Sequence, residues 1–199
     1  MAGQDEQTLI RAAQGGDLNA FNGLVLTYQD IVYTVCYRII GDAESAADAA
    51  QESFLTAYRR LETYRGGNFR SWLLRLTTNT CYDLLRYHKR RPAAYLDDLT
   101  PEDSDDEPPI PDAASTPEQA TLENELSTAI QRCIQALSED QRVVLVMNDI
   151  EGYSYQDIAD TLNTQLGTVK SRLSRARTNV RRCLQGVKEL LPSAYRLED

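Results

Sequence analysis

The sequence predicts an all-α protein made of two small helical domains that are joined by a flexible acidic linker. Helix-start signals followed by apolar residues at helical spacing recur in both halves of the 199-residue chain. Between these halves, residues 92–116 are rich in Asp, Glu and Pro, and they cannot bury enough apolar surface to offset the entropy of ordering. We therefore expect a first domain over residues 1–91 and a second over residues 117–199.

The negative charge of the chain is concentrated in the linker and the residues directly after it. The whole chain has a net charge of −9, yet residues 92–125 hold 11 acidic residues and no basic one. We interpret this run either as a solvated spacer or as a segment that mimics or repels nucleic acid, or that follows a positively charged channel. Fully extended, the 25 residues of the linker reach roughly 80 Å. That length lets the two domains bind sites two turns of B-DNA, about 70 Å, apart.

Three helices are expected in the first domain. One covers residues 17–40 and ends at Gly41, and the next covers residues 43 to about 64. A Gly-Gly turn precedes the third, which covers residues 69–91 and interleaves aromatic with basic residues. Such a helix can stack aromatic rings on unpaired bases while its cations follow the nucleic-acid backbone. Trp72 itself is expected to pack in the core, because apolar residues neighbour it at helical spacing.

Three capping signals mark helix starts in the second domain. They are Thr116 before Pro117, Ser138, and Ser154. Gly152 is expected to end the helix that starts after Ser138. A short helix, a turn at residues 163–165 and a basic amphipathic helix then follow one another, which is typical of a helix-turn-helix.

The last predicted helix combines an apolar stripe with a concentration of positive charge. Residues 166–188 hold seven basic residues and no acid. In a helix-turn-helix this second helix enters the major groove, where arginine can bond guanine and other cations neutralise phosphates. The alternative is a solvated basic helix or a calmodulin-type target helix. The stripe consists of Leu166, Val169, Leu173, Ala176, Val180, Leu184 and Val187.

The cysteine and histidine content points away from a metal site or a catalytic site. The four cysteines lie 45, 52 and 50 residues apart without a C-x-x-C pair, so we expect buried thiols in a reducing compartment. His88 is expected at the surface or facing DNA. No signal peptide or membrane span is visible, which predicts a cytoplasmic protein. We expect no cofactor and no metal.

Two segments resemble the bacterial extracytoplasmic-function (ECF) sigma factors. FRSWLLRLTTNTCYDLLRYHKRR, residues 69–91, resembles their region two. LSEDQRVVLVMNDIEGYSYQDIADTLNTQLGTVKSRLSRAR, residues 137–177, resembles their region four. The resemblance implies a non-enzymatic factor that binds core RNA polymerase, through its β′ clamp and β flap, and directs initiation at specific promoters. An anti-sigma factor is a further partner that is common in the family.

The resemblance also implies site residues. Region two would recognise the promoter −10 element and accept a flipped base, whose unstacking costs a few kcal/mol. Region four would recognise the −35 element. The −10 residues implied are Tyr64, Arg65, Asn68, Phe69, Arg75, Asn79, Arg86 and Arg90. The −35 residues implied are Thr168, Lys170, Ser171, Arg172, Ser174, Arg175 and Arg177. The polymerase-binding residues implied are Asp48, Gln51 and Glu52, with Ala49 and Ala50 where the family usually has bulkier apolar residues.

Two other functions are alternatives to a sigma factor. A one-component regulator would bind duplex operators without polymerase, but it would not need the aromatic-basic helix of the first domain. A nuclease would need clustered carboxylates or histidines near the basic helices. The chain has one histidine, and its acidic cluster is confined to the Pro-rich linker.

The free chain is expected to bind promoter DNA weakly and to bind it tightly only together with core polymerase. The acidic linker repels DNA until polymerase sequesters it, and each basic helix alone makes few contacts. Gel shifts on a promoter fragment that the holoenzyme transcribes check this expectation. Strong specific binding by the free chain would contradict it.

Overall fold

The computed structural model describes residues 2–90, 117–187 and 189, and in these ranges every regular element is helical. The chain divides into two compact units, Met1–Arg90 and Arg91–Asp199. The all-α prediction is confirmed, and the linker predicted over residues 92–116 lies outside the described residues. Within the described ranges, no helix is both long enough and apolar enough to cross a membrane.

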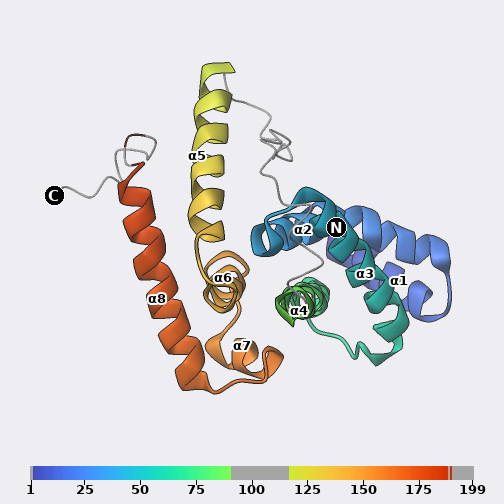
Figure 1. Ribbon diagram of the computed structural model, residues 1–199. Helices are drawn as coiled ribbons and strands as arrows, with labels where there is room; N and C mark the ends of the chain where they lie inside the picture. Colours follow the sequence, from blue (N-terminus) through green and yellow to red (C-terminus); the bar gives the residue numbers. More distant parts are fainter. Residues whose placement is uncertain (1, 91–116, 188, 190–199) are drawn as a thin grey trace. The chain divides into compact units, whose positions relative to one another are not determined.

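The N-terminal unit is a bundle of four helices in which α2 contacts the other three (Figure 1). Helix α1 precedes all the helices that the sequence predicts, so it is an addition to the expected architecture. The 3₁₀ turn η1 ends the segment that was predicted to be helical up to residue 64. The elements are α1 (Ala2–Gln14), α2 (Leu18–Ile40), α3 (Ala43–Arg60), η1 (Leu61–Thr63) and α4 (Phe69–Arg90).

Side-chain caps fix the ends of α2 and α3. The carboxylate of Asp17 accepts hydrogen bonds from the backbone N–H groups at positions 19 and 20, at 2.8 and 3.2 Å. Gly41 ends α2 in the left-handed conformation, with φ of 91°, which a residue without Cβ adopts at little cost. Asp42 then caps α3 by accepting from the backbone N–H of Ser45 at 2.7 Å. The predicted break between these two helices is confirmed.

Helix α3 packs against α2 and α4 through a row of small side chains. Ala46, Ala49, Ala50, Ser53 and Ala57 are all buried. Small side chains let helix backbones approach closely, so Ala49 and Ala50 suit this close packing. The hydroxyl of Ser53 is satisfied inside the bundle, because it donates to the carbonyl of Ala49 at 2.6 Å.

The C-terminal unit packs α5, α6 and α7 against the long helix α8. Figure 1 shows α5 and α8 running alongside each other. The buried run Val143–Met147 passes from α6 into a π-helical segment, η3, which the sequence did not predict. The elements are α5 (Pro117–Gln135), α6 (Glu139–Leu145), η3 (Val146–Ile150), α7 (Tyr155–Thr161) and α8 (Leu166–Gln185).

The predicted helix starts after Ser138 and Ser154 are confirmed in position, but Ser138 makes no side-chain capping hydrogen bond, and Thr116 lies outside the described residues. Pro117 is the first residue of α5, and Ser138 and Ser154 stand at the N-caps of α6 and α7. The hydroxyl oxygen of Ser154 accepts from the backbone N–H of Asp157 at 3.1 Å. Gly152, with φ of 74°, follows the π-helical segment in the left-handed conformation.

The prediction of four buried thiols is right for two of the cysteines and wrong for the other two. Cys36 and Cys81 are free and buried, as predicted. A hydrogen bond with Cys36 and then burial raise the pKa of the Cys81 thiol. Cys133 and Cys183, however, form a disulfide between α5 and α8 rather than remaining thiols. The two residues are 50 positions apart, and only the antiparallel packing of α5 on α8 brings their Cα atoms within 5.6 Å.

Replacing both Cys133 and Cys183 by Ser should destabilise the C-terminal unit by about 2–4 kcal/mol in oxidising buffer, because the bond closes a long loop in the unfolded chain. Hydrogen exchange of the α5 and α8 amides measures this change. In a reducing buffer the variant and the wild-type chain should exchange alike. Equal protection in oxidising buffer would show that the disulfide does not stabilise the unit.

Candidate nucleic-acid interface

One side of α8 is buried and the opposite side is exposed and cationic. Val169, Leu173 and Ala176 are buried against the rest of the unit. Successive residues of an α-helix are rotated by about 100°, so residues 171, 174 and 175 lie on the far side from this stripe, and residue 170 lies on one flank at about 90° from it. These four side chains, Lys170, Ser171, Ser174 and Arg175, are all exposed, and Thr168 beside them is half-buried. We call the four the outer face of α8.

Arg172 lies at one edge of the buried stripe and pairs with an acid of α6. Its Nη2 lies 2.7 Å from Oδ2 of Asp140, and the two side chains are 24% and 44% exposed. On the same side of α8, the amide of Asn179 donates to Oε1 of Gln141 at 3.1 Å. One flank of α8 is therefore tied to the first turn of α6.

Arg177 lies at the other edge of the stripe and is held by the π-helical segment. Its Nε and Nη2 bind the two carboxylate oxygens of Asp149, at 2.9 and 2.5 Å. Its Nη2 also donates to Oδ1 of Asn148 at 2.9 Å. The hydrogen bond with Asp149 raises the pKa of the guanidinium above its already high value. Arg177 thus makes the fork-shaped contact with a carboxylate that is characteristic of arginine.

A hollow of about 440 Å³ lies beside the outer face of α8. Cationic and hydroxyl side chains dominate its lining, a composition that suits a phosphate group. Three of the lining residues were not predicted from the sequence: Tyr155, at the start of α7, and Thr178 and Arg181, further along α8. The lining residues are Tyr155, Lys170, Leu173, Ser174, Arg177, Thr178 and Arg181.

The short helix α6 is fixed to α5 by a buried arginine. The Nη2 atom of Arg142 donates to the carbonyls of Gln135 and Leu137, at 2.7 and 3.1 Å. Gln135 is the last residue of α5, where a helix lacks internal donors for its carbonyls, and Leu137 follows two residues later. Burial lowers the pKa of this guanidinium. The acids of α6 and η3 that bind α8 are therefore carried by a well-anchored element.

In the N-terminal unit, the loop before α4 is built on an aromatic cluster. Tyr64 and Phe69 are buried, and their ring centroids lie 5.4 Å from each other and 5.4 Å from that of Trp72. The hydroxyl of Tyr64 donates to the carbonyl of Gly67 at 2.7 Å. Gly66 and Gly67 have φ of 101° and 97°, values that favour glycine. The predicted −10 residues Tyr64 and Phe69 thus form the base of the loop, while Arg65 and Asn68 are exposed.

Two amide side chains tie this loop to its surroundings. Oδ1 of Asn68 accepts from the backbone N–H of Ser71 at 2.9 Å, so Asn68 caps α4. Gln14 of α1 donates to the carbonyls of Leu61 and Tyr64 at 3.0 and 2.9 Å. This role of Gln14 was not predicted from the sequence, because no helix is expected there before Asp17.

One side of α4 lines up several of the predicted −10 residues. Trp72, Arg75, Asn79 and Arg86 share a face at helical spacing, with Arg75 and Arg86 exposed and Trp72 and Asn79 half-buried. Arg86 stacks over the ring of Tyr82, 5.7 Å from its centroid, on the same face. Tyr82 was not assigned from the sequence. The side chain of the remaining predicted residue, Arg90, lies outside the described residues.

The predicted polymerase-binding residues share an exposed face of α3. Asp48, Gln51 and Glu52 are all exposed, and the next turn presents Leu55, which is 49% exposed. Glu52 pairs with Arg59 at 3.1 Å across two turns of the helix.

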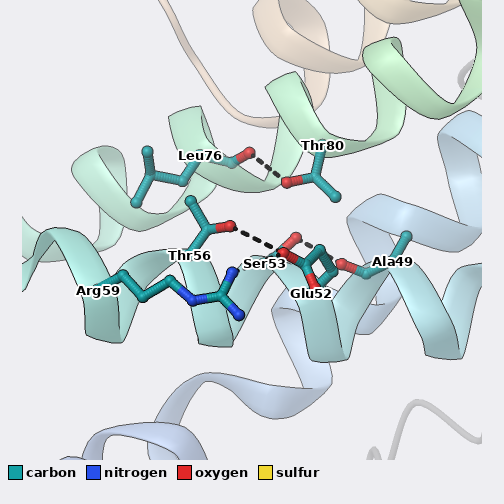
Figure 2. A network of polar contacts seen from close by, with 7 residues as sticks. All are labelled: Ala49, Glu52, Ser53, Thr56, Arg59, Leu76 and Thr80. Carbon is teal, nitrogen blue, oxygen red and sulfur yellow. Dashed lines mark hydrogen bonds and ion pairs between the residues drawn. The ribbon is translucent and has the colours of Figure 1, made fainter.

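A groove runs beside this face, between α3 and α4. Figure 2 shows Thr56 of α3 and Thr80 of α4 on the facing sides of the two helices. Their hydroxyls bond to Oε1 of Glu52 and to the carbonyl of Leu76, at 3.4 and 3.1 Å. The groove combines three acids with apolar side chains, a lining that suits a basic amphipathic partner helix. Its lining residues are Asp48, Ala49, Glu52, Thr56, Thr80, Asp83, Leu84 and Tyr87.

Comparison with known protein families matches both units. The family model for sigma-70 region 2 matches residues 24–91, and the model for sigma-70 region 4 matches residues 127–180. The RNA polymerase sigma-H factor of Pseudomonas aeruginosa is 39% identical over 186 residues, which cover 92% of this chain and 95% of that protein. The ECF RNA polymerase sigma-E factor of Escherichia coli K12 is 35% identical over 173 residues, covering 86% and 90%. The chain belongs to the ECF sigma factors.

Two solved structures share this fold. The sigma factor RpoE of Bartonella quintana, solved with the anti-sigma factor NepR, has a TM-score of 0.62 at 23% identity, covering 84% of this chain and 98% of that one. CnrH, solved with the cytosolic domain of CnrY, has a TM-score of 0.58 at 21% identity, covering 92% and 98%. As an ECF sigma factor the chain is a non-enzymatic subunit that binds core RNA polymerase and promoter DNA and directs promoter-specific initiation.

Replacing Asn68 by Ala should lower the free energy of unfolding of the N-terminal unit by about 1 kcal/mol, because α4 loses its N-cap. Trp72 is the only tryptophan in the chain, so its fluorescence follows unfolding of this unit. Asn68→Asp is the matched control, since aspartate caps equally well and should leave stability unchanged. A loss of equal size in both variants would contradict the capping role.

Proposed function

We propose that this sigma factor reads the promoter −35 element with the outer face of α8 and the −10 element with α4 and the loop before it. The observation that carries the proposal is that each unit presents one exposed cationic helix face, opposite a buried apolar stripe. Within the described residues, the two faces together with the loop before α4 contain most of the positions that resemble the DNA-binding positions of the family. Duplex recognition suits α8, and recognition of unpaired bases suits the aromatic-cationic face of α4.

For the −35 element, Lys170, Ser171, Ser174 and Arg175 are proposed to face the major groove. Arginine can bond guanine through two hydrogen bonds, and lysine neutralises phosphate as a point charge. Thr168, Arg172 and Arg177 border this face and remain predicted −35 residues. The last two already bind acids of their own unit, which limits the directions in which their guanidinium groups can reach.

For the −10 element, the proposed surface joins the loop to the exposed face of α4. Arg65, Asn68, Arg75 and Arg86 are exposed and polar, so they can contact the strand backbone and base edges. Asn79 is half-buried on the same face. Tyr64 and Phe69 support the loop from below, and Arg90 belongs to the proposed set by its resemblance alone.

For core polymerase, the proposed contact is the face of α3 that carries Asp48, Gln51 and Glu52, with the groove beside it. Exposed Leu55 adds an apolar element between the polar side chains. The partner proposed is the β′ clamp, with the C-terminal unit on the β flap. Such a factor works beside the chromosome, so we also propose that the chain is cytoplasmic.

An anti-sigma factor is proposed as a further partner. Two solved relatives with the same fold are in complex with the anti-sigma factor NepR and with the cytosolic domain of CnrY. The groove between α3 and α4 offers acidic and apolar groups to such a partner as well as to polymerase. Competition between an anti-sigma factor and core polymerase for the sigma factor would then silence transcription.

Run-off transcription with core polymerase tests the proposal. The wild-type chain should direct initiation at discrete sites on genomic fragments. Lys170→Ala and Arg175→Ala should each weaken holoenzyme binding to those promoters by about 1–3 kcal/mol if the side chain contacts a base, and should lower the salt dependence if it contacts a phosphate.

Arg132→Ala is the matched control for these variants, because Arg132 is exposed on α5 and its loss changes the net charge equally. Promoter binding by the control should stay close to that of the wild-type holoenzyme. If the Lys170 and Arg175 variants bound as well as the control, the −35 assignment would fail.

A further inference from the structure

We propose that Asp149, assisted by Asn148, is a positioning residue for promoter recognition: it holds Arg177 and so sets the rotation of α8 about its own axis. The inference rests on the proposed reading of the −35 element by α8. For Arg177, this inference replaces the direct DNA contact that the family resemblance implies by a role inside the protein.

The two ion pairs of α8 lie on opposite flanks of its buried stripe. At about 100° per residue, Arg172 falls some 60–70° to one side of the stripe and Arg177 about as far to the other side. Asp140 of α6 binds the first, and Asp149 of η3 binds the second. A helix that is packed through small and branched apolar residues can roll on its support. Polar contacts on both flanks oppose rolling in either direction.

The contact at Arg177 is the more directional of the two. Two nitrogens of its guanidinium bind both carboxylate oxygens of Asp149, and one of them also binds Asn148. Asn148 is itself fixed, because its Nδ2 donates to the carbonyl of Tyr153 at 2.6 Å. Both side chains come from the π-helical segment, and such segments are frequent at functional sites.

The ion pair is poorly explained by stability alone. The side chains of Arg177 and Asp149 are 50% and 32% exposed, and ion pairs as exposed as this contribute little to folding. Arg177 also lines the cationic hollow beside the outer face, together with Lys170 and Arg181. An acid at this place opposes DNA binding by its charge, so its presence needs a compensating role. Positioning of α8 supplies that role.

Because Asp149 is an acid, a purely electrostatic role and a positioning role predict different effects of its replacement on DNA binding. If only charge matters, Asp149→Asn removes a repulsive group and releases Arg177 toward phosphate, so DNA binding should tighten and its salt dependence should steepen. If Asp149 positions α8, the same variant should lose preference for the −35 sequence.

The experiment uses holoenzyme made from the full chain and duplexes that wild-type holoenzyme enriches from a pool randomised over the −35 region. The measured quantity is the ratio of the Kd for a scrambled −35 sequence to the Kd for the enriched one. Asp149→Asn should lower this ratio about fivefold or more, which is the smaller end of the loss expected for one base contact. Asp160→Asn, which removes an exposed acid of α7 that bonds within its own helix, should change the ratio less than about twofold.

Arg177 provides the second test. Arg177→Ala should lower the ratio as Asp149→Asn does, while the slope of log Kd against log salt stays at the wild-type value. A slope smaller by about one would show a phosphate contact instead. The double variant with Asp149→Arg and Arg177→Asp exchanges the two charges and can re-form the ion pair, so it should recover part of the Kd ratio. If the single variants lost the ratio because they failed to fold, the double variant would not recover it.

The outcomes distinguish failure of the positioning role of Asp149 from failure of the proposed −35 recognition by α8. If wild-type holoenzyme enriches no −35 sequence, the proposed reading of the −35 element is wrong. If it does enrich one and Asp149→Asn binds with unchanged or increased preference, Asp149 does not position α8. Thermal unfolding of each variant, expected within about 2 °C of wild type because the ion pair is exposed, confirms that the comparison is made between folded chains.

Discussion

The function of the C-terminal unit depends on the burial of one narrow apolar stripe of α8. Val169, Leu173 and Ala176 pack against the short helices before them, and this burial decides which side of the helix faces water. Because helix geometry fixes the angle between successive residues, every cation of α8 has its direction set by those three side chains. The ion pairs with Asp140 and Asp149 then add a directional restraint that apolar packing lacks. Recognition in the groove requires a cationic face that points in a fixed direction, because the hydrogen-bond donors and acceptors of the base edges have fixed positions.

The N-terminal unit also presents charged helix faces in fixed directions, but it does so through close helix packing and an aromatic cluster. Small buried side chains on α3 allow close packing against α2 and α4, which leaves the acidic face of α3 and the cationic face of α4 exposed. The aromatic cluster of Tyr64, Phe69 and Trp72 supports a loop whose two glycines adopt conformations that other residues avoid. The unit thereby separates surfaces of opposite charge on neighbouring helices. Such separation suits a protein that must bind both a polymerase and DNA.

Much of this architecture could be predicted from the sequence because its signals are local. Asp17, Gly41 and Ser154 mark helix boundaries through contacts with residues two to four positions away, and the stripe of α8 follows from spacing alone. The features that were missed depend on distant partners. The disulfide joins cysteines 50 residues apart, and the pairs of Arg172 and Arg177 reach back 32 and 28 residues. No local pattern encodes which acid will meet which arginine. Helix α1 was missed for another reason, because it has few apolar residues at helical spacing.

The most direct test of the central claim is a photo-crosslink from the outer face of α8 in a holoenzyme–promoter complex. A crosslinking side chain at Ser174, on the exposed side opposite the stripe, should label the −35 region of the promoter. The same group at Ala136, which is exposed after the end of α5, should not. The predicted result is that the −35 region is crosslinked from position 174 and not from position 136. Equal labelling from both positions, or labelling only from Ala136, would contradict the orientation of α8 on which the account depends.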